Sequence, residues 1–251
     1  MTDPVTPAPS AAPAAGSRTE LEGLRTLLAV STQRLLGDTI AVTDEDWRGP
    51  SRLPGWSRGH VATHLARQAD ALRRVTEGAR TGERQAMYAS SEQRDAEIAA
   101  GADRSGLDLQ IDLDTTAGHL GDAFDTLEEL DAWDTEVELH GGLRCPARLL
   151  PLARLLEVVL HHVDLDVGLD MGDVDPATAE WLLEWCCFRL RHRDEFPQLR
   201  LVTDTGFTSN VGSSGASRTV SGSSAALLGW LTGRTGPETV EGTEALLLPA
   251  F

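Results

Sequence analysis

The sequence predicts a mainly α protein with a smaller α/β part, organised as a four-helix bundle followed by a small C-terminal α/β domain. Four segments in the first two thirds of the chain carry apolar residues at helical spacing and are joined by mostly short connections. Strand-like and Ser/Gly-rich stretches appear only after about residue 170. At 251 residues with 41% hydrophobic content, the chain can bury a substantial core.

Composition excludes several classes of partner. A formal net charge of −17 argues against nucleic acid and anionic membranes, which would repel the protein. No apolar run approaches the roughly 20 residues that span a bilayer, and no basic-then-apolar leader is present. Three cysteines, two of them adjacent at Cys186 and Cys187, suit a reducing compartment. We therefore expect a cytoplasmic protein whose cysteines serve packing.

The N-terminal part begins with a low-complexity segment. Residues 1–16 are mostly Ala, Pro, Thr and Ser, a composition that predicts a disordered tail. Ser17 and Glu20 then have capping-box spacing, and leucines follow at helical period. A first helix is therefore predicted from Ser17 to about Leu36.

Two histidines stand out in the second predicted helix. After a polar turn over residues 44–47 and a Pro-Gly turn at residues 54–55, Ser57 is in position to cap this helix. His60 and His64 lie four residues apart and therefore share one helical face. Each can equally be an ordinary histidine, partly exposed for His60 and hydrogen-bonded in the core for His64.

The middle of the chain supplies the remaining bundle elements. Residues 82–103 mix apolar and charged residues and include Tyr88, the only tyrosine, and Arg94. A third helix is predicted from about Asp114 to Leu130. Residues 137–145 indicate a small two-stranded ribbon or an extended connection. Pro151 is expected to open the fourth helix.

The fourth predicted helix sets a carboxylate and an imidazole one turn apart inside an apolar run. Glu157 and His161 are at positions i and i+4 in LLEVVLHHVDLD. Alone, this spacing is more typical of a solvated glutamate and an ordinary histidine than of a metal site. In a bundle, inward side chains of facing helices can share a metal, so His64 would add a second nitrogen. Three protein ligands with an open fourth position are typical of catalytic zinc.

The C-terminal region changes character. Asp175-Pro176 predicts a helix start, with the helix running to about Arg191. A strand is expected at Leu199–Thr203, followed by a turn, a Ser/Gly-rich loop and a short helix ending in GWLTGR at Gly229–Arg234. The apolar run at residues 245–248 is a further candidate strand. Residues 171–251 are interpreted as a separate α/β domain.

Three runs together resemble the mycothiol-dependent maleylpyruvate isomerase family. They are LPGWSRGHVATHLARQADAL at residues 53–72, MYASSEQRDAEIAAGA at residues 87–102 and RLLEVVLHHVDLDVG at residues 154–168; GWLTGR near the C-terminus fits as well. The first and third runs are shared with the wider group of DinB-like metalloproteins, while the second narrows the resemblance to the isomerase. The resemblance covers most of residues 17–250.

The resemblance implies a DinB-like bundle over residues 17–170 that holds one divalent metal, usually zinc, and a C-terminal α/β domain. It implies that His64, Glu157 and His161 are the metal ligands, with His60 and His162 as non-ligands. The position of an essential arginine of the C-terminal domain corresponds to Arg234. The implied reaction is the cis-to-trans isomerisation of maleylpyruvate to fumarylpyruvate, a step of gentisate degradation, with mycothiol as thiol cofactor.

Chemistry adds expectations about substrate and mechanism. A thiolate can add reversibly to an activated double bond. Because no cysteine lies near the metal motifs in the sequence, we expect the thiol to be an external low-molecular-weight compound. A dicarboxylate substrate needs local cations, for which the metal, Arg234, Arg94 and Arg58 are candidates. Arg94 and Tyr88 are expected to bind substrate, although their charged neighbours are equally compatible with a solvated surface. The alternatives are a mycothiol S-transferase, a non-catalytic DinB-like protein and, ranked low, a hydrolase with Glu157 as base. Metal identity and oligomeric state stay open, a monomer being compatible.

Overall fold

The computed structural model describes residues 17–191, 193–244, 246–249 and 251, so the tail predicted over residues 1–16 lies outside the described part. The chain divides into two compact units, Leu21–Val174 and a second one formed mainly by Asp175–Phe251. Within the described residues, no helix combines the length and apolarity needed to cross a membrane.

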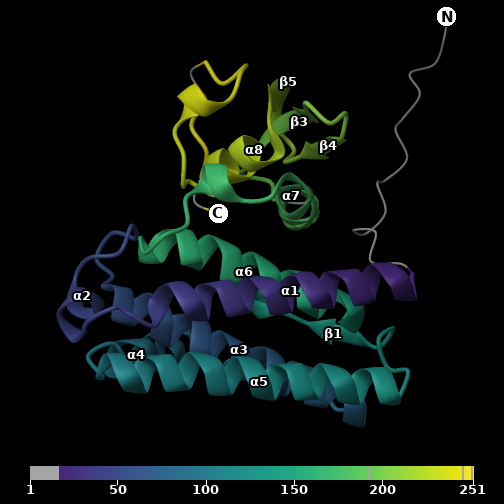
Figure 1. The fold of residues 1–251 in the computed structure, drawn as a ribbon. Helices are drawn as coiled ribbons and strands as arrows, with labels where there is room; N and C mark the ends of the chain where they lie inside the picture. The colour runs from purple at the N-terminus through teal and green to yellow at the C-terminus, as the bar shows by residue number, and fades with distance from the viewer. Residues whose placement is uncertain (1–16, 192, 245, 250) are drawn as a thin grey trace, which may run out of the picture. The chain divides into compact units, whose positions relative to one another are not determined.

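Four long helices form the first unit (Figure 1): α1 (Arg18–Thr39), α3 (Arg58–Thr81), α5 (Gly106–Glu129) and α6 (Leu150–Leu165). Helix α3 packs against both α5 and α6. Together with the small sheets, these helices confirm the predicted mainly α class with a smaller α/β part. The predicted starts are also observed, because the Ser17 hydroxyl accepts from the Glu20 amide and Ser57 caps α3.

Helix α3 owes its central place to small and apolar residues that let neighbours approach closely. Leu65 and Leu72 are fully buried, and several alanines separate them. At the start of α3, a Cβ on Gly59 would lie 2.1 Å from the Ala102 carbonyl oxygen. Only glycine allows this approach, which seats helix α4 (Ser91–Gly101) against α3. Helix α4 was not predicted as a helix, and it carries Arg94.

Two boundaries in the first unit differ from the prediction. The expected polar turn at residues 44–47 is a short helix, α2 (Asp44–Arg48), because the Thr43 hydroxyl accepts the Asp46 amide and thereby caps it. Helix α5 begins at Gly106, eight residues before the expected start, because Ser105 caps it in the same way. Both caps depend on short side chains whose role the apolar period did not reveal.

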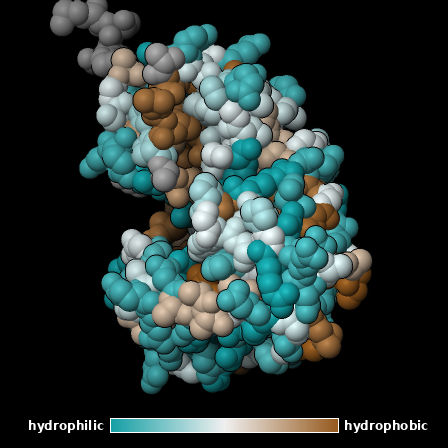
Figure 2. Space-filling model, turned by 90° about the vertical axis from the view of Figure 1, so that its left-hand side faces the viewer, coloured by the Kyte–Doolittle hydropathy of each residue, from teal (hydrophilic) through white to brown (hydrophobic). Residues whose placement is uncertain are grey.

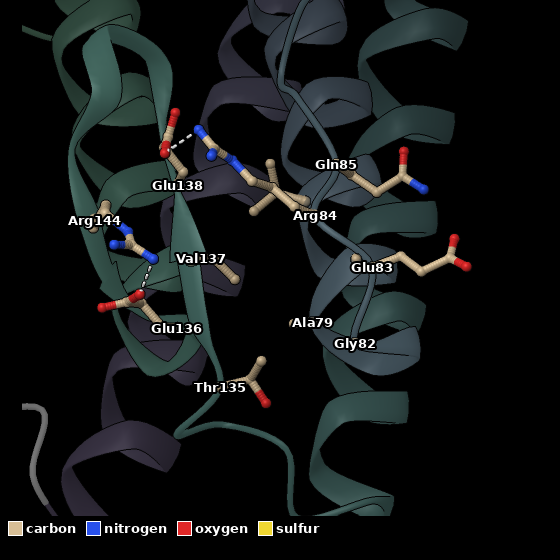
Figure 3. Close-up of a pocket in the computed structure, with 12 residues that line it drawn as sticks. Ala79, Gly82, Glu83, Arg84, Gln85, Thr135, Glu136, Val137, Glu138 and Arg144 are labelled. Atoms are coloured by element: carbon tan, nitrogen blue, oxygen red, sulfur yellow. Dashed lines mark ion pairs between the residues drawn. The ribbon is translucent and has the colours of Figure 1, made fainter.

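A two-stranded ribbon, one of the two forms expected for this segment, packs against α3. Strands β1 (Glu136–Glu138) and β2 (Arg144–Pro146) pair antiparallel. Figure 3 shows the cavity between this ribbon and the chain leaving α3, with a volume of about 140 Å³. Its polar wall is held by ion pairs of Glu138 with Arg84 and of Glu136 with Arg144. These four charged side chains therefore form ion pairs with one another.

The second unit is built around a three-stranded sheet in the order β4-β3-β5. Strand β3 (Pro197–Thr203) pairs antiparallel with β4 (Thr208–Val211) and parallel with β5 (Ser214–Gly222). Helices α7 (Pro176–Leu190) and α8 (Ser224–Leu231) supply apolar residues to the same core, including Leu183, Leu227 and Trp230. The predicted helix start at Asp175-Pro176 is confirmed, since Asp175 caps α7.

Two expectations for this unit were wrong. The Ser/Gly-rich stretch is not a loop but contributes β4 and β5, because backbone pairing with β3 compensates for low strand propensity. The described residues 246–248 are not a strand, and Leu247 is 91% exposed. The edge of β5 is instead met near this point by a single bridge from Ser221 to Glu241.

The surface agrees with the strongly acidic composition. Figure 2 shows one face on which hydrophilic residues cover most of the area and hydrophobic residues form separate patches. Exposed large apolar side chains among the described residues include Val30, Ile40, Leu107 and Ile111. Scattered apolar residues of this kind are normal on protein surfaces.

Candidate metal centre

The structure brings together three side chains that the sequence placed on two helices. His64 lies on α3, and Glu157 and His161 lie one turn apart on α6. The neighbours of Glu157 and His161 along α6 are almost all buried apolar residues, so the helix is held firmly against α3. The three ligand atoms lie within 4.8 Å of one another.

The distances in this group suit a tetrahedral metal site. Oε2 of Glu157 lies 3.0 Å from Nε2 of His64 and 3.3 Å from Nε2 of His161. Ligand atoms about 2.1 Å from a tetrahedral zinc ion lie roughly 3.4 Å apart. The two imidazole rings meet edge to face, with centroids 4.6 Å apart. Two nitrogens and one carboxylate oxygen therefore converge on one point.

The three side chains differ in their exposure to solvent. His64 is 7% exposed, His161 is 13% exposed and Glu157 is 25% exposed. Glu157 is therefore the member of the group that solvent reaches most.

Both nitrogens of the His161 ring face carboxylates. Nε2 faces Glu157, and Nδ1 lies 2.8 Å from Oδ2 of Asp164, whose side chain is 1% exposed. Burial works against a charged ring, but the hydrogen bonds to Asp164 and Glu157 outweigh it and raise the pKa of His161. Burial likewise opposes the Glu157 carboxylate, yet hydrogen bonds from His161 and His64 keep its pKa well below the ordinary value.

His64 behaves differently from His161. Burial lowers the pKa of His64 to about 4, with only partial compensation from the hydrogen bond to Glu157. Nη2 of Arg94 donates to Nδ1 of His64 at 3.2 Å, so the neutral ring carries its proton on Nε2 and donates it to Glu157. The group thus combines one neutral and one readily protonated imidazole.

Arg94 and Tyr88, the predicted substrate-binding residues, lie beside the same group. The guanidinium of Arg94 contacts His64 and lies 5.8 Å from the Tyr88 ring centroid. Burial and the nearby Glu157 raise the pKa of Tyr88, so its hydroxyl stays protonated at neutral pH. An arginine and a phenol donor therefore border the candidate centre.

The other candidates have different surroundings. Arg58 donates from Nε to the Leu165 carbonyl and from Nη1 to the Asp46 carbonyl, so it ties helix ends together rather than facing the centre. Nδ1 of His60 lies 2.7 Å from the Ser57 hydroxyl in the α3 cap. Arg234 lies in the second unit, after α8, where Nη1 donates to the Thr232 carbonyl.

Two neighbours of the centre were missed from the sequence. Trp56 presents its indole to the His64 ring, with centroids 5.7 Å apart. Asp164 orients His161, a common arrangement for metal-binding histidines, whose second nitrogen donates to a carboxylate. Its spacing of three residues from His161 was a usable signal, because i and i+3 share a helical face.

Two solved structures are similar to this chain. A crystal structure of the mycothiol-dependent maleylpyruvate isomerase, and one of a histidine-to-alanine mutant of it, each match with a TM-score of 0.82 and 27% sequence identity. Each match covers 92% of this chain and 97% of the other. A search of curated proteins gave no significant match.

A family model for the mycothiol maleylpyruvate isomerase N-terminal domain matches residues 28–166. This range includes the whole candidate centre and the helices that carry it. The prediction of an isomerase enzyme is confirmed at this level by the family and by the structural match. Because the matched range is more than half of the chain, the protein belongs to the mycothiol maleylpyruvate isomerase family.

Proposed function

We propose that this protein isomerises maleylpyruvate to fumarylpyruvate with mycothiol as thiol co-substrate, at a divalent metal held by His64, Glu157 and His161. The observation that carries the proposal is the convergence of three donor atoms of the right chemistry within 4.8 Å, inside the segment that the family model matches. The relatives of known structure are described as mycothiol-dependent maleylpyruvate isomerases. The substrate and thiol are taken from that description.

The donor set fits zinc best among common metals but does not select it uniquely. Two imidazoles and one carboxylate are typical of catalytic zinc, and they also suit other divalent transition metals. The bound ion would supply a Lewis acid that stabilises negative charge on a thiolate or on a substrate oxygen. With one carboxylate among three ligands, the site would have a smaller net positive charge than a three-histidine site.

The thiol is proposed to come from outside the chain. Burial raises the pKa of Cys145 to about 12, and burial likewise raises the pKa of Cys187 to about 12 and that of Cys186 further. Buried protonated thiols are poor nucleophiles, because the thiolate is the reactive form. Reversible addition of an external thiolate would turn the substrate double bond into a single bond, allow rotation and restore the double bond when the thiolate leaves with its electrons.

Arg94 would bind a substrate carboxylate. Coordination through Nε2 of His64 would require the ring proton at Nδ1, which would remove the acceptor to which Arg94 donates. The guanidinium would then be free to form a bidentate pair with a carboxylate. Tyr88, which lies against Arg94, would hold that side chain in place and offer its hydroxyl to the same ligand. Arg234, in the second unit, is proposed as the essential arginine that the family resemblance implies.

The test uses the full-length protein with maleylpyruvate, with and without mycothiol and a chelator, and follows fumarylpyruvate by absorbance. We expect one divalent ion per chain by elemental analysis, and loss of both the ion and the activity in His64→Ala. The exposed His119 on α5 is a matched control, and His119→Ala should change neither. Arg234→Met should lower kcat/KM by about a hundredfold while the metal content stays unchanged.

Different outcomes would support the alternatives. Stoichiometric consumption of mycothiol without fumarylpyruvate would indicate an S-transferase that conjugates another electrophile. Absence of bound metal from the purified wild-type protein, with no activity after metal addition, would indicate a non-catalytic protein of this fold. Product formation that needs neither thiol nor metal would overturn the mechanism.

A further inference from the structure

A second cavity lies between α1 and α5 and has a volume of about 310 Å³. The two helices run antiparallel (Figure 1), since Arg25 pairs with Asp125 while the Leu36 carbonyl accepts from Gln110. This volume is at the lower end of the range of small-molecule sites, about 300–1,000 Å³. None of the candidate metal ligands lines the cavity.

The cavity reaches Arg154, a charged side chain of α6 inside the bundle. Arg154 is 3% exposed. Its Nη1 donates to the Leu65 carbonyl at 2.8 Å and to Oε1 of Gln68 at 2.6 Å, both of them neutral acceptors. Glu157 and Asp70 act on it through space and favour its charged form, but no carboxylate of the described residues forms an ion pair with it. Burial lowers the pKa of Arg154 to about 10, so the side chain still carries its charge at neutral pH.

A buried cation that forms no ion pair is stabilised only in part by charges at a distance, so a directly bound anion would stabilise it further. The other guanidinium nitrogens of Arg154 can donate further hydrogen bonds, because Nη1 provides both bonds to protein acceptors. An arginine fork matches a carboxylate in geometry and charge. A carboxylate that enters the cavity would therefore be a suitable direct partner for these nitrogens.

The residues that line the cavity indicate which kind of ligand body would fit beside the carboxylate. Leu28, Leu36, Leu120 and Phe124 are buried apolar residues of the lining. Gly118 and Gly121 leave the α5 side open, since a Cβ added at either would meet no atom within 4 Å. The helices have therefore left room that larger side chains would have filled. An apolar body of the size of one aromatic ring would pack against these residues.

The rim restricts the charge of the ligand. Asp114, Asp122 and Asp125 line the α5 side and are exposed, and Arg25 is already paired with Asp125. A second negative charge on a ligand would lie near these carboxylates and be repelled. The cavity thus favours a single carboxylate.

We propose that this cavity binds a monocarboxylate with a small apolar body, whose carboxylate pairs with Arg154. The proposal is independent of the proposed isomerisation, because it uses a different cavity and a monoanion instead of a dicarboxylate. It assigns to the bundle a second, small-molecule site on its α1–α5 side.

The test measures binding of benzoate to the metal-loaded full-length protein by isothermal titration calorimetry, with benzyl alcohol and phthalate as comparison ligands. We expect benzoate to bind at least about tenfold more tightly than either, because only benzoate combines the ring with a single carboxylate. Gly121→Leu, which fills the cavity, should weaken benzoate binding at least about tenfold. Gly23→Leu on the exposed side of α1 is the matched control and should leave it unchanged.

Two further variants identify the partner and the place. Arg154→Met should bind benzoate and benzyl alcohol with affinities within about twofold of each other. If that variant does not fold, the comparison of Gly121→Leu with Gly23→Leu decides alone. His64→Ala should retain benzoate binding, which would be lost if benzoate bound at the metal centre. Equal affinity of the wild-type protein for benzoate and benzyl alcohol, or unchanged binding in Gly121→Leu, would overturn the proposal.

Discussion

Replacement of Asp164 by asparagine should weaken metal binding without disturbing the bundle. Oδ2 of Asp164 lies 2.8 Å from Nδ1 of His161, and its side chain is 1% exposed, so water does not screen the interaction. The asparagine side chain would have the same shape and could still accept the hydrogen bond, but it would lose the charge that increases the basicity of the ring. Such outer partners typically change metal affinity by about 10- to 100-fold, which corresponds to about 1.4–2.7 kcal/mol.

The assay is competition with a chromophoric zinc chelator at pH 7.5, supported by elemental analysis. Asp166→Asn is the matched control, because Asp166 ends the same helix with a side chain that is 49% exposed, and asparagine tolerates its left-handed backbone with φ of 57°. It should change the zinc affinity by less than about twofold. Equal affinities for Asp164→Asn and wild type, or equal losses in the two variants, would refute the reasoning, provided that circular dichroism shows both to be folded.

The centre and its surroundings yield three further predictions. Below the raised pKa of His161, the proton on His161 competes with the metal while His64 is still neutral, so the metal affinity should fall about tenfold for each unit by which the pH decreases. Calorimetry in this pH range should find that metal binding releases about one proton. A release of two protons would contradict this protonation scheme. Gly59→Ala should lower the free energy of unfolding in urea by about 1–3 kcal/mol, because the added Cβ would lie 2.1 Å from a carbonyl oxygen. Gly118→Ala should raise the free energy of unfolding by up to about 1 kcal/mol, because open space surrounds this helical position. A change of the same sign in both variants would be inconsistent with the packing. Arg94→Gln should raise KM for maleylpyruvate about tenfold or more in steady-state kinetics with metal content unchanged, and an unaltered KM would remove Arg94 from substrate binding.

Local patterns in the sequence were sufficient for most helices. The Ser17–Glu20 box, the Ser57 cap and the Asp175-Pro176 start each combine a short polar side chain with an apolar period, and each is observed. These signals act within one turn of chain, so no tertiary information is needed to read them. Where a cap lay in a polar segment, as at Thr43 and Ser105, the helix start was missed.

The strands of the second unit show the opposite situation. Residues 208–222 have the composition of a loop, and they become β4 and β5 only because β3 offers backbone partners on both sides. The run near residue 247 has the composition of a strand, but the described residues there find no such partner. Strand formation depends on pairing at a distance, which composition does not encode.

The sequence by itself identified the three side chains of the candidate centre. Helix geometry places Glu157 and His161 on one face. His64 was added because facing helices of a bundle can share a metal, and because of the family resemblance. Only the tertiary structure decided which atoms meet, how far apart they lie and which partners surround them. Arg94 and Asp164 contact the two histidines through hydrogen bonds whose existence depends on packing and side-chain orientation. The same holds for Arg154, because only the positions of its neighbours show that this buried cation donates to neutral acceptors.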